Sequence, residues 1–267
     1  MKIKLLLLFI LSINSFALSC NNATQKIFFE KDVKGIVLIA HGLNLNPEKM
    51  ETLGNYYKSQ NIEPLYVKLT GHTKNTNWKA ASKQKWIKDF YLPLCQAQLN
   101  AKELNVPLYA LGYSLGAVVI QHAIEKFRVP FKSVMYIAPA FKTRWYTGFI
   151  TSLFKMGLEF NIPSGNFVEY RAKPNTGLLA YKAMWELSQD LKYKDSVPKT
   201  IIMDKRDELI DIYSTRDLCK KWESCQFTEI ASSPTKNEKT IYHLAIDQAT
   251  LGQKMWNKVT SKISLSL

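Results

Sequence analysis

The sequence is poor in residues that bind metals. Its 267 residues include four histidines and four cysteines, and no CxxC or HxxxH pair occurs among them. Pairs with such spacing supply the ligands of many zinc sites, so we expect no metal. The chain also lacks internal repeats and low-complexity tracts, while apolar residues make up 46% and charged residues 22%. Those proportions are typical of a folded globular domain.

Long hydrophobic runs are confined to the N-terminus. Residues 1–19 contain two lysines, the apolar run LLLLFIL and several small residues, a combination typical of a secretory signal peptide. Cleavage is expected after Ala17 or Ser19; lipid attachment to Cys20 and an uncleaved anchor are the alternatives. No later stretch approaches the roughly 18 to 20 apolar residues that a membrane-spanning helix needs. The sequence thus predicts a periplasmic or secreted protein.

Export permits disulfide bonds among the four cysteines. Cys219 and Cys225 are close enough in the sequence to close a small loop, and we predict this pair. Because four cysteines allow three pairings, the sequence does not determine the partners of Cys20 and Cys95.

Acidic residues are outnumbered. The chain has 36 lysines and arginines against 22 aspartates and glutamates, a net charge of +14 that falls to +12 without the two signal-peptide lysines. The basic residues are scattered and form no dense block, so we expect no nucleic-acid partner. We interpret them as a solvated basic surface that also favours peripheral association with an anionic membrane.

Hydrophobic patterning predicts an α/β fold. Short apolar, β-branched runs of the kind found in buried parallel strands alternate with segments of helical period, which indicates a mostly parallel, doubly wound sheet. Pro93 is expected to kink or divide the second helix. The strands are predicted at 35–40, 64–69, 108–111, 133–137, 200–203 and 226–230, and the helices at 47–60, 78–104, 115–127, 178–191, 213–222 and 243–263.

The alternation breaks between residues 141 and 199. The predicted core therefore comprises residues 20–140 and 200–267, with an inserted helical cap, or lid, between them. Such an insertion is expected over the carboxyl ends of the strands, where open α/β folds bind ligands; two helices that only extend the core are the alternative. Aromatic and apolar residues recur there at helical spacing, and a second helical pattern follows. The predicted substrate-binding residues of the cap are Trp145, Phe149, Met156 and Trp185, and Leu153 and Phe160 continue the first pattern.

One serine lies in a setting that suits a nucleophile. Gly112-Tyr113-Ser114-Leu115-Gly116 follows a predicted strand and opens a predicted helix. A GxSxG sequence at a sharp strand-to-helix turn is the pattern of a nucleophile elbow, and the helix N-terminus stabilises negative charge there. We therefore interpret Ser114 as a nucleophile and not as a small turn residue.

A nucleophilic serine needs a base, and the four histidines leave a short choice. In folds of this class the chain order is serine, acid, histidine, and His243 is the histidine that comes late enough. We expect His41 and His72 to support loops by hydrogen bonding and His122 to be an ordinary helix residue.

The acid is expected within the segment TIIMDKRDELIDIY. Asp207 fits best, because it follows the strand on a loop and apolar residues come after Glu208. Asp204 is expected to end the strand, and Asp211 to cap the next helix.

These motifs, taken in order, resemble those of the serine α/β hydrolases, nearest the bacterial carboxylesterase and monoacylglycerol lipase branch. The resemblance implies an oxyanion hole formed by the backbone N–H groups of Leu43 and Leu115. The chain departs from the family pattern in having Thr73 where the family often has glycine, in lacking a glycine near Asp204, and in a short segment before residue 35. The matching motifs run from residue 35 to the C-terminus and are His41-Gly42-Leu43, Gly71-His72, the GYSLG motif, Asp207-Glu208-Leu209-Ile210 and His243-Leu244.

The resemblance implies hydrolysis of carboxylic esters through an acyl-enzyme, without a cofactor. The aromatic cap favours lipid or other apolar acyl substrates. The same residues would serve a thioesterase or an acyltransferase, and a non-catalytic binding protein that keeps the fold is the alternative from another class.

Overall fold

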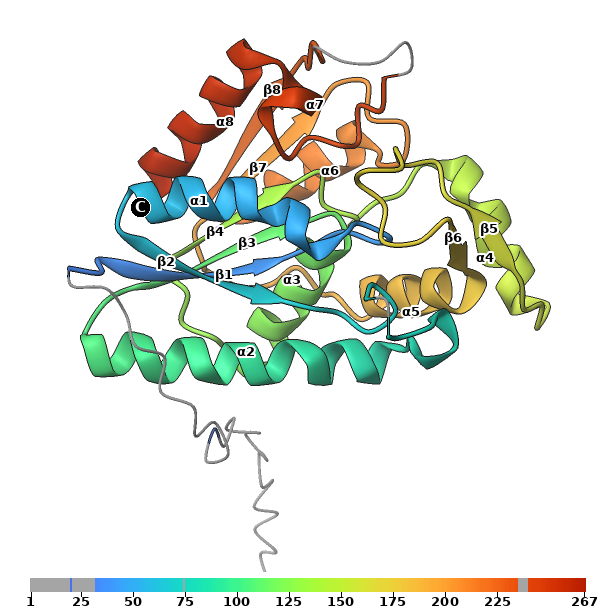
Figure 1. Cartoon of the computed structure of the whole chain (residues 1–267), viewed down its shortest axis with the longest axis horizontal. Coiled ribbons are helices and arrows are strands. Elements are labelled where there is room, and N and C mark those ends of the chain that lie inside the picture. Colours follow the sequence, from blue (N-terminus) through green and yellow to red (C-terminus); the bar gives the residue numbers. More distant parts are fainter. Residues whose placement is uncertain (1–19, 21–31, 74, 235–239) are drawn as a thin grey trace, which may run out of the picture.

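The computed structural model describes residue 20 and residues 32–73, 75–234 and 240–267 (Figure 1). The predicted signal peptide and most of the predicted short segment before residue 35 lie outside the described residues. Among these described residues, every helix is too short or too polar to span a bilayer.

A six-stranded sheet forms the centre of the molecule, in the order β2-β1-β3-β4-β7-β8. Every neighbouring pair is parallel, which confirms the predicted mostly parallel sheet. Three strands are buried at every residue, as expected where helices cover both faces. The strands are β1 (Gly35–Ala40), β2 (Ile62–Val67), β3 (Leu108–Tyr113), β4 (Ser133–Ile137), β7 (Lys199–Asp204) and β8 (Cys225–Ile230).

Helices cover the two faces of this sheet (Figure 1). Alternate residues of β1 enter two separate cores, since successive side chains of a strand point to opposite faces. Ile36 and Leu38 pack with α2 and α3, whereas Val37 and Ile39 pack with α1 and α8. The helices are α1 (Glu51–Ser59, after a 3₁₀ turn at Pro47–Met50), α2 (Lys83–Leu104, after a 3₁₀ turn at Trp78–Ala80), α3 (Leu115–Phe127), α6 (Ile212–Cys219), α7 (Gln248–Leu251) and α8 (Gln253–Ser266).

Of the two predicted effects of Pro93, a kink or a division, the division does not occur, because α2 continues from Lys83 to Leu104 through that residue. A proline inside a helix costs about 3 kcal/mol. The buried face of α2 offsets this loss, since each large apolar side chain that leaves water contributes roughly 1.5–3 kcal/mol. That face recurs at helical spacing and consists of Trp86, Phe90, Leu94, Ala97 and Ala101.

The C-terminal segment also departs from the prediction of one helix over 243–263. The helical structure begins only at Gln248, where the Asp247 side chain accepts a hydrogen bond from the Thr250 N–H in a capping box. Gly252 then separates α7 from α8. His243 consequently lies on a loop ahead of the helices.

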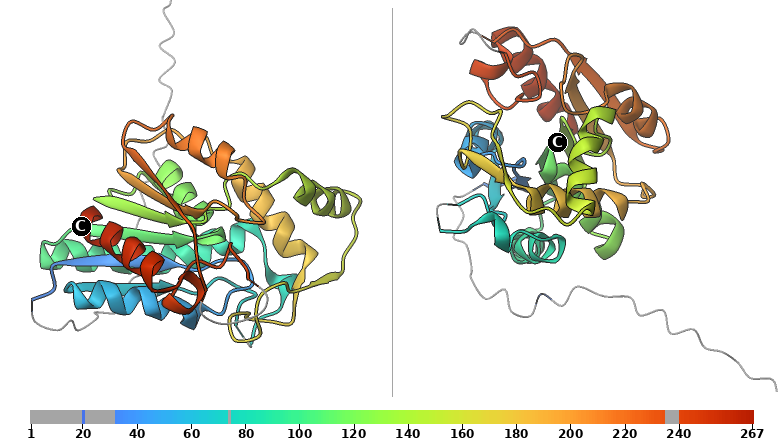
Figure 2. Two further views of the ribbon diagram at one scale, coloured as in Figure 1. Left: turned by 90° about the horizontal axis from the view of Figure 1, so that it is seen from above. Right: turned by 90° about the vertical axis from the view of Figure 1, so that its right-hand side faces the viewer.

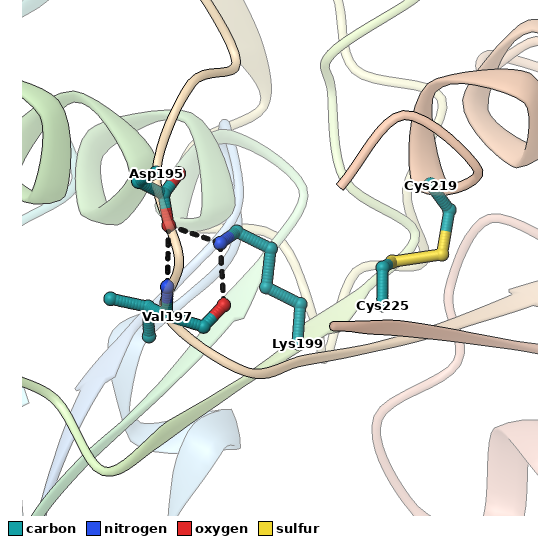
Figure 3. Close-up of a disulfide and its surroundings, with 5 residues drawn as sticks. All are labelled: Asp195, Val197, Lys199, Cys219 and Cys225. Carbon is teal, nitrogen blue, oxygen red and sulfur yellow. Dashed lines mark hydrogen bonds and ion pairs between the residues drawn. A yellow bond between two sulfur atoms is a disulfide. The ribbon is translucent and has the colours of Figure 1, made fainter. Parts of the chain in front are cut away.

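Two disulfides join Cys219 to Cys225 and Cys20 to Cys95. The first confirms the predicted pair and links the end of α6 to the start of β8 (Figure 3). Nearby, Asp195 accepts hydrogen bonds from the Lys199 ammonium and the Val197 N–H (Figure 3). A sulfur bonded to Cys95 cannot also carry a lipid thioether, so this disulfide and lipidation of Cys20 exclude each other. Both disulfides are compatible with an extracellular protein.

The segment 141–199 leaves the sheet after β4 and returns at β7. It contains α4 (Gly148–Lys155), the antiparallel pair β5 (Asn161–Pro163) and β6 (Asn175–Gly177), and α5 (Leu178–Gln189). Helix α5 packs into the core with α2 and α3. Helix α4 stands at the periphery of the molecule in both Figures 1 and 2. It ends at Lys155 because Gly157 has a left-handed backbone (φ +75°), so the helical pattern does not extend to Phe160.

Candidate active site

Ser114 occupies a strained turn between β3 and α3. Its backbone has φ +50°, a region that non-glycine residues rarely adopt and that commonly marks functional sites. The flanking glycines permit the turn: a Cβ on Gly112 would lie 2.6 Å from the Ala117 nitrogen, and one on Gly116 would collide with the Ala40 carbonyl. The GxSxG sequence thus folds as the predicted strand–turn–helix, with Ser114 at its apex.

His243 and Asp207 meet Ser114 from two other loops. The loop after β8 carries His243, whose Nε2 lies 2.9 Å from the Ser114 Oγ. The loop after β7 carries Asp207, whose Oδ2 lies 2.8 Å from the His243 Nδ1. All three side chains are nearly inaccessible to water. Residues 114, 207 and 243, which were predicted from three separate parts of the sequence, therefore form one hydrogen-bonded chain.

Asp207 is held in place by its second carboxylate oxygen. This Oδ1 accepts hydrogen bonds from the backbone N–H groups of Leu209 and Ile210, both at 2.8 Å. Arg144, from the start of the insertion, donates its Nε–H to the Asp207 carbonyl at 2.8 Å. The carboxylate therefore presents one oxygen to His243 in a fixed orientation.

The environment of His243 sets its affinity for a proton. Burial disfavours the charged imidazolium, but the neighbouring Asp207 and Glu208 carboxylates outweigh this effect and raise the pKa of His243 above its ordinary value. The Tyr113 ring packs against the imidazole at a centroid distance of 5.4 Å, and its hydroxyl donates to the His243 carbonyl at 3.2 Å. This arrangement suits a histidine that takes up a proton transiently.

The other carboxylates of the segment 204–211 each have a different role. Asp204 ends β7 and pairs with Arg206, and Asp211 caps α6, as predicted for both. Glu208 was not expected to act on the histidine. Its two oxygens accept hydrogen bonds from the Tyr242 and His243 N–H groups, at 3.1 and 2.8 Å. Nothing in the sequence reveals this contact, because the two segments lie far apart in the chain.

Two backbone N–H groups beside Ser114 are free to bind a ligand. Gly42 lies against Ser114, since a Cβ on Gly42 would be 3.2 Å from the Ser114 Cβ, and Leu43 follows it. Leu115 is the first residue of α3. Within the described residues, neither the Leu43 N–H nor the Leu115 N–H donates to a protein acceptor. Of the two predicted oxyanion-hole residues, Leu115 directly follows Ser114 in the chain, and Leu43 directly follows the glycine that lies against Ser114.

The family follows from a comparison of sequences. A family model described as "Serine aminopeptidase, S33" matches residues 31–165, which is half of the chain. The chain belongs to this family of α/β hydrolases. No curated protein sequence matches it significantly.

Solved structures of α/β hydrolases agree with the family. A structure described with the metagenome-derived lipolytic enzymes LipS and LipT has a TM-score of 0.71 at 18% identity, and the alignment covers 87% of this chain and 93% of the other. A soluble variant of monoglyceride lipase from Saccharomyces cerevisiae gives 0.68 at 12% identity, covering 88% and 86%. The monoacylglycerol lipase of Paleococcus ferrophilus gives 0.67 at 13% identity, covering 88% and 96%. These likenesses establish the α/β-hydrolase fold.

The remaining histidines of this hydrolase lie apart from the hydrogen-bonded chain. Burial lowers the pKa of His41 to about 4, so its ring is neutral; its Nε2 accepts the Leu69 N–H at 3.1 Å and its Nδ1 lies 3.0 Å from the Gly42 carbonyl. The Nδ1 of His72 lies 3.1 Å from the Leu69 carbonyl. Both support loops, as predicted. His122 lies within α3, also as predicted.

The four predicted cap residues of the hydrolase differ in exposure. Trp145, Phe149 and Met156 are 90%, 70% and 73% exposed, whereas Trp185 is half-buried and its ring packs on Phe154. Their role in substrate binding stays a prediction. Among the described residues, no group of three or more histidine, cysteine or acidic side chains is arranged to hold a metal ion.

Proposed function

We propose that the protein is an exported carboxylic ester hydrolase in which Ser114 is the nucleophile, His243 the general base and Asp207 the residue that orients the imidazole. One observation carries the proposal: the unbroken chain from Ser114 Oγ to His243 Nε2 (2.9 Å) and from His243 Nδ1 to Asp207 Oδ2 (2.8 Å). These are the distances expected of a nucleophile, its base and the group that fixes the base.

The first half of the reaction transfers the acyl group to the enzyme. The Ser114 oxygen attacks the ester carbonyl carbon while the His243 Nε2 takes the hydroxyl proton. Negative charge then develops on the former carbonyl oxygen, where the Leu43 and Leu115 N–H groups would donate hydrogen bonds. The C–O bond to the alcohol breaks as His243 returns the proton to the leaving oxygen, which gives an acyl-serine and a free alcohol.

The second half regenerates the serine. Water loses a proton to His243 and attacks the acyl carbon, and the Ser114 oxygen leaves with the returned proton, which releases a carboxylic acid. A thiol ester or an acceptor alcohol would fit the same sequence of steps. A thioesterase or an acyltransferase therefore remains the second candidate, and it rests on the same side chains. Export is supported by the signal-like residues 1–19 and by the two disulfides.

We further propose that the acyl group is apolar, as in a lipid ester. Four large apolar side chains of the insertion are more than two-thirds exposed, namely Trp145, Phe149, Met156 and Val168, which is unusual for residues without a ligand or surface to cover them. The neighbouring folds include proteins named as lipolytic enzymes and monoglyceride lipases. Both observations favour a substrate whose acyl chain contacts Trp145, Phe149 and Met156.

A series of p-nitrophenyl esters from acetyl to palmitoyl tests the substrate class. We expect kcat/KM to rise at least about 10-fold from acetyl to octanoyl, because each buried methylene contributes about 0.8 kcal/mol. A steep preference for acetyl would contradict the apolar-acyl proposal while leaving ester hydrolysis intact. Failure of a fluorophosphonate probe to label the folded protein would favour the non-catalytic binding protein instead.

The insertion and the adjoining α6 segment are also proposed to associate with an anionic membrane. A cavity of about 610 Å³ lies between the two ends of the insertion and the segment of α6, and its lining includes four lysines and Asp217; one of these lysines, Lys142, is three residues before Trp145. The other three are Lys192, Lys194 and Lys221, and within the described residues none of the three makes an ion pair. Clustered lysines suit the negatively charged headgroups of such a membrane, and the exposed aromatic residues of the same insertion suit its apolar interior.

Vesicle co-sedimentation tests the membrane proposal. Replacing Lys192, Lys194 and Lys221 with glutamine is expected to weaken binding to phosphatidylglycerol vesicles about 100-fold, because each lysine near an anionic surface contributes roughly 1 kcal/mol. The control replaces three exposed lysines of α2 and α8 and leaves the cavity unchanged. An equal loss of binding in the control would mean that only net charge matters. The control positions are Lys88, Lys102 and Lys254.

A further inference from the structure

The turn that presents the Leu43 N–H is closed by a residue with an unusual backbone. The Leu45 N–H donates to the Gly42 carbonyl at 3.3 Å, so Leu43 and Asn44 are the two central residues of the turn. Asn44 has φ +51°, as the third residue of a type II turn requires. Asparagine tolerates this conformation better than most residues. The backbone of Asn44 therefore helps to set the direction of the Leu43 N–H.

The side chain of Asn44 is buried and fully engaged, with 2% of the residue exposed. Its Nδ2 donates to the Lys173 carbonyl at 3.0 Å, the Asn175 carbonyl at 3.3 Å and the Thr176 Oγ1 at 2.9 Å. Its Oδ1 accepts the Lys173 N–H at 2.9 Å. All these partners belong to one segment of the insertion, which runs into β6.

Backbone contacts strengthen the same connection. The Ala172 N–H donates to the Asn44 carbonyl at 3.1 Å, and the Asn46 N–H donates to the Tyr170 carbonyl at 2.8 Å. Residues 170–176, which we call the returning arm, are thus joined to the turn on both sides of Asn44. The turn is in effect a shared element of the core and the insertion.

We propose that Asn44 is a positioning residue that aims the Leu43 N–H at the reacting oxygen by clamping the turn to the returning arm. The inference rests on the proposed ester hydrolysis and deepens it. Its physical basis is that a hydrogen-bond donor stabilises an oxyanion strongly only when it is already oriented before the reaction. Without the Asn44 side chain the turn keeps its sequence neighbours, but it loses four hydrogen bonds that fix its position.

Three variants separate the clamp from the turn itself. Asn44→Gly keeps the left-handed backbone accessible and removes the side chain. Thr176→Val changes the other end of the clamp, since it removes one acceptor with little change in shape. The matched control is Asn46→Ala, because Asn46 lies two residues further along and, within the part of the chain that the structure describes, its side chain makes one hydrogen bond, which it accepts from the Glu48 N–H.

The measurements are steady-state kinetics, fluorophosphonate labelling and amide hydrogen exchange of residues 42–46. We expect Asn44→Gly to lower kcat and the labelling rate by about 10- to 100-fold, below the loss for deleting a donor outright. KM should change less than about threefold, since the proposed acyl contacts are made by the insertion residues Trp145, Phe149 and Met156 and not by the turn. Thr176→Val should also lower kcat and the labelling rate, but by a smaller factor than Asn44→Gly. Amide exchange of residues 42–46 should be faster than in the wild type in Asn44→Gly and Thr176→Val, but not in Asn46→Ala.

The proposal is overturned if Asn44→Gly and Thr176→Val retain wild-type kcat and labelling rates in folded samples, or if Asn46→Ala loses activity equally. Faster exchange without a loss in rate would also overturn it, because the clamp would then be structural only. A wild-type protein that neither hydrolyses esters nor labels at Ser114 contradicts the proposed function instead, which keeps the two failures distinct.

Discussion

Replacing Ser114 with alanine is expected to lower kcat for ester hydrolysis by about 10⁶-fold, to the residual rate that binding and the oxyanion hole provide. The physical reason is that no other described nucleophile is within hydrogen-bonding reach of the His243 Nε2, which lies 2.9 Å from the Ser114 Oγ. Loss of the hydroxyl removes the acyl-enzyme path altogether. Steady-state hydrolysis of a p-nitrophenyl ester measures the effect, and fluorophosphonate labelling should disappear in parallel.

A second buried serine provides the control. Ser232 is 3% exposed, and it contacts Asp204, whose Oδ2 accepts the Ser232 backbone N–H. Ser232→Ala should leave kcat within about twofold of the wild type, because the two ring nitrogens of His243 contact Asp207 and Ser114 and not Ser232. If Ser114→Ala hydrolyses the ester at the wild-type rate, Ser114 is not the nucleophile.

Replacing Asp207 with asparagine is expected to lower kcat by about 10⁴-fold, the size of the effect in a well-studied serine protease of another fold. An amide in place of the carboxylate offers its N–H to His243, which favours the imidazole tautomer with the proton on Nε2. That tautomer cannot accept the Ser114 proton. Folding should be less affected, since the remaining oxygen can still accept the Leu209 and Ile210 N–H groups, both 2.8 Å away.

The matched control is Asp211→Asn on the same loop. Asp211 caps α6 by accepting the Ser214 N–H, and asparagine caps a helix nearly as well. Its kcat should therefore stay within about twofold of the wild type. A similar loss in both variants, or a full rate in Asp207→Asn, would contradict the assignment of Asp207 as the orienting acid.

Glu208→Gln extends this experiment to the dependence on pH. His243 acts as a base only when neutral, so kcat/KM rises as the pH passes upward through its pKa. The Asp207 and Glu208 carboxylates both raise the pKa of His243, and removing the Glu208 charge should shift the rising limb to lower pH. Tyr113, which also faces the ring, stays neutral because burial raises its pKa. If activity falls but the rising limb of the kcat/KM profile stays at the same pH, Glu208 acts only through its hydrogen bonds to the Tyr242 and His243 N–H groups.

The local patterns of the sequence determined the core elements and the order of the site. The strands 35–40 and 133–137 and the helix 115–127 were predicted with the bounds that the structure has. Such predictions succeed because a buried parallel strand is a continuous apolar run and a helix repeats every 3.6 residues. Ser114 was found in the same way, since a strand, a turn with two glycines and a helix follow one another directly.

The tertiary structure alone decided what joins residues far apart in the chain. The sequence contains four carboxylates between residues 204 and 211. Only the fold shows that Asp207 bonds to the His243 imidazole and that Glu208 accepts the His243 backbone N–H. The fold also ends α4, the first α-helix of the insertion, at Lys155. Through the side chain of Asn44, it joins the insertion to the turn that presents the Leu43 N–H. Local periodicity carries no information about such contacts, because they depend on which loops meet at the carboxyl ends of the strands.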